Sequence, residues 1–108
     1  MTSNSSALPI VGHLINGEIV TTSARSLDVF NPATAEITKR VAVADKATVE
    51  SAIAAAQAAF PEWRNTPPIK RARVMFRFKQ LLEEHADEIC RLIGEEHGKI
   101  VHDAQGEL

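Results

Sequence analysis

The stretch HLINGEIV, residues 13–20, places two short apolar runs on either side of an Asn-Gly pair. Asn-Gly supplies the positive φ angles that a tight type I′ turn requires, so this stretch predicts a β-hairpin. Further strands are predicted at 27–30, which the turn residues Asn31 and Pro32 stop, and at 36–43. Strands this short are marginal alone, and we expect them to pair as hairpins against a larger body.

The pattern changes from strand to helix near Asp45, which is predicted to be the N-cap of a first helix. The apolar face of this helix is mostly alanine, so its backbone must lie close to a neighbour. Pro61 is expected to end the helix. Thr66 is then predicted as the N-cap of a second helix, with Pro67 at its first position and a wide apolar arc beyond.

A third helix is predicted around Ile89, Leu92 and Ile93, with Gly98 as a left-handed C-cap. A fourth helix is expected to start at Ile100. Because no stop signal follows, we expect the sequence to end inside that helix and the chain to be truncated at Leu108.

Composition places the 108-residue chain among ordinary globular proteins. Its net charge of -2 argues against nucleic-acid and membrane-surface binding, and no apolar run reaches the ~20 residues of a membrane span. Residues 1–12 show neither secretory nor transit-peptide features, and we interpret them as a disordered leader. The single cysteine suits a reducing compartment, so we expect a cytoplasmic protein.

Cys90 is the only thiol, and its neighbours on the third helix are apolar. The neighbouring histidine, His85, is five residues away and off that face, so Cys90 is interpreted as structural. His85, His97 and His102, with Asp103, match no metal-ligand spacing. We therefore assign no metal site.

A basic run on the second helix is the strongest charge cluster; it comprises Lys70, Arg71, Arg73, Arg77 and Lys79. We interpret it as a solvated face that the following acidic residues partly balance, with nucleic-acid binding as an alternative. The glycines form no phosphate-binding loop, and Glu95 and Glu96 point to different sides of a helix. No residue of the chain is assigned a catalytic, cofactor-binding or metal-binding role.

Taken in order, the motifs resemble the N-terminal segment of the aldehyde dehydrogenase superfamily. The resemblance rests on residues 15–18 (INGE), 29–34 (VFNPAT), 58–63 (AAFPEW), 71–73 (RAR), 81–84 (LLEE) and 96–99 (EHGK). Within the superfamily, the TPP at 66–68 followed by RARVMFRFK is most similar to the CoA-acylating methylmalonate-semialdehyde (malonate-semialdehyde) dehydrogenases. Ala35 stands where the family often has glycine.

The resemblance implies an α/β enzyme in which residues 13–108 are the N-terminal part of the dinucleotide-binding domain, with β-hairpins at 13–43 and helices at 45–108. It implies oxidation of a semialdehyde to an acyl-CoA through a cysteine thioester, with NAD and CoA, and catalytic residues outside this sequence. It also implies that the Val29 carbonyl and the Glu96 carboxylate help to hold a structural monovalent cation in some members.

On this interpretation the segment is an inactive scaffold whose partners are the remainder of its own chain and further copies, as a dimer or tetramer. In isolation it should expose a sizeable apolar patch. A different hypothesis is a stand-alone interaction module that oligomerises through the second helix. A third is a nucleic-acid-binding domain that uses the basic helix.

Overall fold

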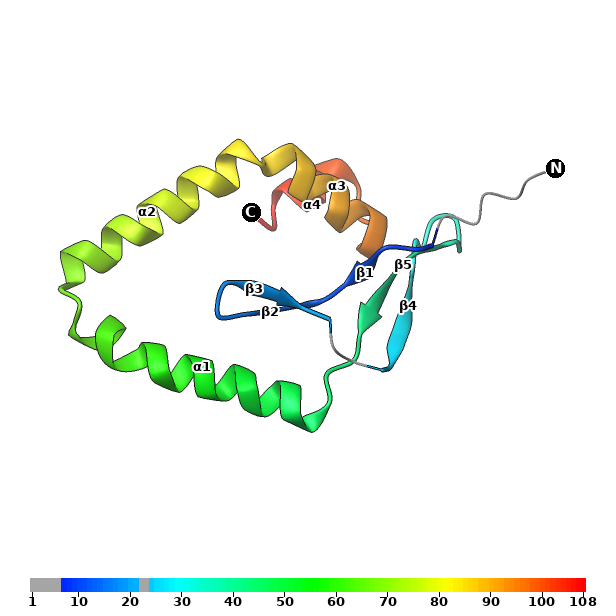
Figure 1. Cartoon of the computed structure of the whole chain (residues 1–108). Helices are drawn as coiled ribbons and strands as arrows, with labels where there is room; N and C mark the ends of the chain where they lie inside the picture. The colour runs from blue at the N-terminus through cyan, green and yellow to red at the C-terminus, as the bar shows by residue number, and fades with distance from the viewer. Residues whose placement is uncertain (1–6, 22–23) are drawn as a thin grey trace.

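The computed structural model describes residues 7–21 and 24–108. Five strands precede four helices (Figure 1), in the order β1 (Ile10–Val11), β2 (His13–Ile15), β3 (Glu18–Val20), β4 (Ser26–Phe30), β5 (Ile37–Ala42), α1 (Lys46–Asn65), α2 (Pro68–Glu84), α3 (Ala86–His97) and α4 (Val101–Gln105). The predicted succession of strands and helices is confirmed. In the view of Figure 1 the elements follow one another around an open ring.

The β2–β3 hairpin forms as predicted. Its strands pair antiparallel up to Ile15 and Glu18, and the two residues between them both have positive φ, 52° at Asn16 and 78° at Gly17. Two consecutive positive φ angles define the type I′ turn, which matches the natural twist of the strands. The hairpin lies beside the alanine face of α1, and Leu14, Ile15, Ala52 and Ala56 line a hollow between them. This confirms the expectation of a close neighbour at that face.

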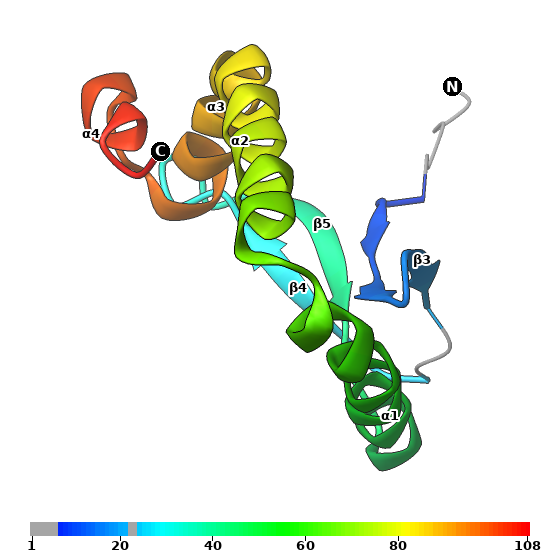
Figure 2. The same ribbon diagram turned by 90° about the vertical axis from the view of Figure 1, so that its left-hand side faces the viewer.

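The second sheet has the order β1-β5-β4, with β5 in the centre. β4 and β5 are antiparallel, whereas β1 runs parallel to β5, with Ile10 opposite Arg40. The leader predicted for residues 1–12 is therefore wrong at Ile10 and Val11, which pair with the central strand. Residues 1–6 lie outside the described residues. α3 and α4 lie on one side of the β4–β5 pair and the hairpin on the other (Figure 2).

The turn between β4 and β5 is organised by Asn31. Its Oδ1 accepts a hydrogen bond from Ala33 N at 2.9 Å, and its carbonyl oxygen accepts one from Ala35 N at 2.8 Å. An Asn side chain that bonds two residues ahead forms an Asx turn, and Pro32 helps to set the backbone. Ala35 completes the turn with a φ of 59°, in the left-handed region. This conformation explains why glycine suits the position.

Asp45 is the N-cap of α1, as predicted. Its Oδ1 accepts hydrogen bonds from Thr48 N at 2.8 Å and from Thr48 Oγ1 at 2.6 Å. The prediction that Pro61 ends the helix is wrong, because α1 continues to Asn65 with Pro61 inside it. Proline removes one hydrogen bond, to the carbonyl four residues earlier, but the N–H groups after it can still bond backwards. Thr66 N, for example, donates to Glu62 O at 3.0 Å.

Thr66 does not cap α2, so that prediction is also wrong. Its hydroxyl donates to Glu62 O at 2.8 Å and therefore closes α1 instead. α2 begins one residue later than expected, with Pro68 at its first position and Pro67 as its cap. Proline suits this first position because the missing N–H has no helical partner there.

α3 follows α2 after His85 alone and ends at Gly98, which has a φ of 77° and donates to Gly94 O at 2.9 Å. The predicted left-handed C-cap is confirmed. α4 ends at Gln105, with Gly106 as its cap, so the expectation that the sequence ends inside this helix is wrong. Within the described ranges, no helix is both long enough and apolar enough to cross a membrane.

Little of the chain is buried. Among the described residues only Ala42, Thr48, Cys90 and Ala104 are buried, and α2 contributes none. Large apolar side chains remain exposed on every long helix, including Ile53, Phe60, Phe76, Phe78 and Leu92. The predicted exposure of apolar surface is thus confirmed. The described elements thus form a frame without a closed core of their own.

Candidate functional site

Cys90 lies at the base of a hollow between α3, α4 and the β4–β5 turn. The hollow has a volume of about 380 Å³, and its lining includes Asn31, Arg91 and Lys99. Cys90 is a free cysteine and only 8% exposed. The two cations are already paired, Arg91 with Glu95 at 2.5 Å and Lys99 with Glu107. A nucleophilic cysteine needs an exposed thiol beside a cation or base, so this position is one of packing, as predicted.

The three histidines of the helical part do not converge. His85 lies at the start of α3, where its Nδ1 is 3.6 Å from Glu88 Oε2. His97 is in the last turn of α3 and His102 is in α4. In the parts of the chain that the structure describes, no group of three or more His, Cys, Asp or Glu side chains is placed to hold a metal ion.

The basic run lies along α2 and is partly neutralised within the same helix. Lys79 pairs with Glu83, and Arg77 Nη1 is 4.0 Å from Glu84 Oε1. These pairs agree with the predicted balance between basic and acidic residues. Exposed pairs of this kind contribute little to stability.

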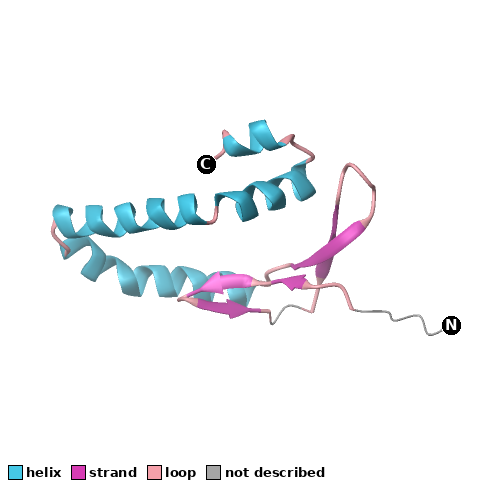
Figure 3. Ribbon diagram, turned by 90° about the horizontal axis from the view of Figure 1, so that it is seen from above, coloured by secondary structure: helices cyan, strands magenta, loops and turns pink. Residues whose placement is uncertain are grey.

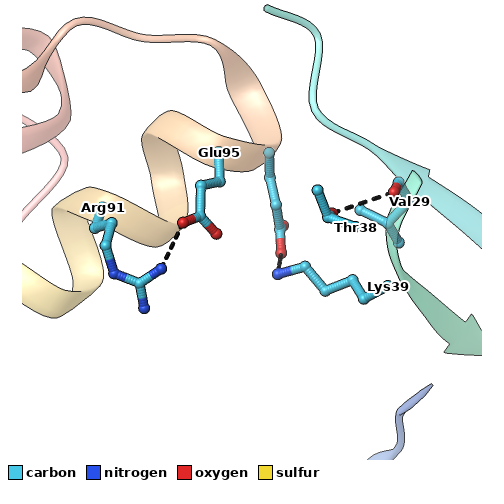
Figure 4. Close-up of polar contacts among 6 residues, drawn as sticks. Val29, Thr38, Lys39, Arg91 and Glu95 are labelled. Carbon is cyan, nitrogen blue, oxygen red and sulfur yellow. Dashed lines mark hydrogen bonds and ion pairs between the residues drawn. The ribbon is translucent and has the colours of Figure 1, made fainter. Parts of the chain in front are cut away.

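A polar junction joins the central strand to α3 (Figure 4). Lys39 Nζ on β5 lies 2.5 Å from Glu96 Oε1, and the Lys39 side chain is only 13% exposed. On the same strand Thr38 Oγ1 donates to Val29 O of β4 at 3.3 Å. Thr38 and Lys39 are consecutive residues, so β5 makes its contacts to β4 and to α3 at one place.

The junction contains both groups that the resemblance associates with a monovalent cation. In this chain the Glu96 carboxylate holds the Lys39 ammonium group, and the Val29 carbonyl accepts from Thr38. Each of these two acceptors therefore already has one donor from the chain itself. Sequence reasoning missed Lys39. No local signal marks this lysine, because β5 reads ITKRVA and its neighbours Thr38 and Arg40 are polar as well.

The fold is that of a mixed α/β segment, with five short strands followed by four helices. The profile of the aldehyde dehydrogenase family matches residues 19–108, and the chain belongs to that family. Its fold agrees with this membership, since the structural neighbours with TM-scores of 0.84 to 0.90 are aldehyde dehydrogenases of several kinds.

Relatives of one substrate class are prominent among the similar proteins. Malonate-semialdehyde dehydrogenase of Pseudomonas aeruginosa is 60% identical over 96 residues, which are 89% of this chain and 19% of that protein. The human acylating methylmalonate-semialdehyde/malonate-semialdehyde dehydrogenase, a mitochondrial protein, is 41% identical over 98% of this chain and 20% of its own length.

Solved structures show the same likeness. The methylmalonate-semialdehyde dehydrogenase DddC from Oceanimonas doudoroffii is 71% identical with a TM-score of 0.90, over 93% of this chain and 20% of that one. A putative methylmalonate-semialdehyde dehydrogenase from Sinorhizobium meliloti, solved with NAD, is 42% identical with a TM-score of 0.89. The match covers 94% of this chain and 21% of that one. The chain thus spans about a fifth of the length of the proteins it matches.

Proposed function

We propose that the chain is the N-terminal part of an NAD-dependent dehydrogenase that oxidises malonate or methylmalonate semialdehyde to an acyl-CoA. The observation that carries this proposal is the 71% identity to DddC, at a TM-score of 0.90, across nearly the whole chain. Identity is lower, 27% to 35%, to the other aldehyde dehydrogenases compared, which act on different aldehydes. This difference in sequence identity favours malonate or methylmalonate semialdehyde as the substrate.

The proposed reaction takes place outside residues 1–108. A cysteine thiolate adds to the aldehyde carbon, and the resulting thiohemiacetal loses a hydride and a proton to become a thioester. NAD supplies the hydride acceptor, and the thiol of CoA takes the acyl group and releases the cysteine. The carboxylate next to the acyl group leaves as carbon dioxide. Cys90 is not this nucleophile, because it is buried on α3 with its neighbouring cations already paired.

The role of this segment is structural support. Its exposed apolar helix faces are those of a layer that other parts of a longer polypeptide cover, and burial of such faces is the main driving force for docking. We further propose that the protein self-associates as a dimer or tetramer. The single, buried cysteine supports a cytoplasmic, reducing location.

The test is an assay of the gene product that contains residues 1–108 together with whatever follows them in frame. With malonate semialdehyde, NAD and CoA, we expect NADH and an acyl-CoA to form together, as measured by absorbance and mass spectrometry. The 108-residue chain alone should form neither. NADH without acyl-CoA would indicate hydrolytic release, and no NADH with either semialdehyde would refute the proposed substrate class. If no coding sequence follows Leu108, the stand-alone interaction module becomes the better hypothesis.

A further inference from the structure

The tip of the β2–β3 hairpin is an exposed Asn-Gly pair. Asn16 and Gly17 are the two central residues of the type I′ turn, and both are exposed to solvent. The turn lies at the end of the hairpin that points away from the β1-β5-β4 sheet (Figure 3). A Cβ built on Gly17 would meet no atom within 4 Å. Solvent therefore reaches the Asn16 side chain and the peptide bond that follows it.

The backbone amide of Gly17 is not used by the fold. In a two-residue hairpin the flanking residues, here Ile15 and Glu18, make the ladder, and the amide of the second turn residue lies outside it. Within the described part of the chain, Gly17 N donates to no acceptor. Glycine also has no Cβ to hinder an approach to its nitrogen. Gly17 N can therefore reach Asn16 Cγ by closing a five-membered ring.

The other asparagines of the described chain do not have such an amide after them. Asn31 precedes Pro32, whose nitrogen carries no hydrogen and cannot attack the side chain. Asn65 is the last residue of α1, and the nitrogen that follows it, Thr66 N, donates to Glu62 O at 3.0 Å. Among the described asparagines, the hairpin tip alone combines exposure with an unbonded amide on a residue without a side chain.

We propose that Asn16 is a site of spontaneous deamidation, which converts it to aspartate and isoaspartate. Gly17 N attacks Asn16 Cγ, so that a carbon–nitrogen bond forms and the Cγ–Nδ2 bond breaks. The side-chain nitrogen leaves as ammonia, together with the proton that Gly17 N gives up. Water then opens the resulting succinimide at one of its two carbonyl carbons, which leaves the chain linked through the α-carboxyl group (aspartate) or the side-chain carboxyl group (isoaspartate). The reaction needs no enzyme, oxidant or cofactor, so the inference does not depend on the proposed function.

The two products have different effects on the hairpin. Aspartate before glycine suits a type I′ turn as asparagine does, so it leaves the β2–β3 register intact. Isoaspartate inserts one more carbon into the backbone of a two-residue turn, so the pairing of Ile15 with Glu18 is lost. β2 is also the strand that contacts α1, and Asn16 and Ala59 line the hollow between the hairpin and that helix. The isoaspartate form should therefore loosen the hairpin from the alanine face.

Peptide mass spectrometry tests this site in the gene product that contains residues 1–108 together with whatever follows them in frame. After incubation at mildly alkaline pH, which promotes loss of the amide proton, we expect a mass gain of about 1 Da at Asn16 and none at Asn31 or Asn65. Methylation by an isoaspartyl methyltransferase identifies the isoaspartate share. Gly17→Asp tolerates the left-handed backbone but places a side chain beside the nitrogen, so the reaction should slow about tenfold or more. Asn16→Gly keeps a Gly-Gly turn and should gain no mass at this position.

The outcomes separate the folded turn from other causes. Equal rates at Asn16 and Asn65, or equal rates in the parent and in Gly17→Asp, would overturn the proposal, because neither would then depend on the Gly17 amide. A reaction that occurs only after unfolding in urea would also overturn it, since the folded turn would not be the reactive form. The isoaspartate form, separated by chromatography, should melt at a lower temperature than Asn16→Asp. Equal melting temperatures would refute the predicted loss of register.

Discussion

Lys39 on the central strand and Glu96 near the end of α3 form an ion pair that joins residues 57 positions apart, with Nζ and Oε1 separated by 2.5 Å. The Lys39 side chain is 13% exposed, whereas that of Glu96 is 51% exposed. The pair thus lies at the edge of the solvent, with the lysine stem packed against the protein. It joins the sheet to a helix in a chain whose described residues bury little apolar surface.

Replacing Lys39 with methionine should therefore destabilise the chain. Methionine keeps most of the packed stem but removes the ammonium group, so the variant isolates the ion pair. We expect a loss of about 1 kcal/mol in the free energy of unfolding, since the half-exposed glutamate reduces the value of a charged hydrogen bond. Urea unfolding, monitored by circular dichroism, measures this change in the free energy of unfolding. Lys46→Met, which breaks the exposed Lys46–Glu50 pair, is the control and should change stability by less than about 0.5 kcal/mol. Equal losses in both variants would contradict a special role for Lys39.

Replacing Ala35 with glycine should stabilise the chain. Ala35 has a φ of 59°, a left-handed conformation that costs an L-residue roughly 1–2 kcal/mol and glycine almost nothing. Glycine also loses more entropy on folding, so the expected net gain is about 0.5–1 kcal/mol. Ala33→Gly in the same turn is the control and should destabilise, because Ala33 has no positive φ to relieve. An Ala35→Gly variant that is less stable than the parent would show that the turn is not strained.

Local signals in the sequence were sufficient for the elements but not for every boundary. The Asn-Gly hairpin, the Asp45 cap and the Gly98 cap were predictable because each rests on a few adjacent residues. Thr66 was misassigned because a Thr hydroxyl can bond forwards as an N-cap or backwards to a carbonyl, and the choice depends on how α1 ends.

Pairings between residues far apart in the sequence could not be predicted from local patterns. Nothing near Ile10 and Val11 indicates that they join β5 as a parallel strand, since their partner lies 30 residues away. The Lys39–Glu96 pair depends on the position of α3 over the sheet in the same way. The candidate site was anticipated only in part: Val29 and Glu96 came from the family resemblance, but their actual partners, Thr38 and Lys39, are set by tertiary structure.

The N-cap of α1 should make the stability of the chain depend on pH in the acid range. Hydrogen bonds from the Thr48 hydroxyl and backbone N–H lower the pKa of Asp45 below its ordinary value. A carboxyl whose pKa is lower in the folded state stabilises the fold above its unfolded pKa, and that contribution is lost as the pH falls through the folded pKa. Melting temperatures between pH 2 and 6 should therefore fall more steeply for the parent than for Asp45→Asn.

The asparagine variant is the matched control because it can still accept from Thr48 but cannot be protonated. Glu107, whose pKa is lowered by its hydrogen bond and charge contact with Lys99, titrates in the parent and in the variant alike. The difference between the two curves therefore reports Asp45 alone. Parallel curves would mean that the cap does not contribute to acid sensitivity.

Replacing Gly98 with alanine should strongly disturb the contact between α3 and the β4–β5 turn. The residue has a φ of 77°, and a Cβ added there would lie 3.0 Å from Pro32 Cγ. The left-handed backbone and the crowding against a rigid ring act together, so we expect a loss of about 1–2 kcal/mol or more in the free energy of unfolding. Gly106→Ala is the control, since Gly106 has an ordinary helical φ of -68° and its added Cβ would approach only Asp103 O, at 3.3 Å. Urea unfolding measures both variants, and the effect of Gly98→Ala should exceed that of Gly106→Ala. If the two variants are equally stable, the C-cap geometry and the Pro32 contact do not hold α3 against the turn.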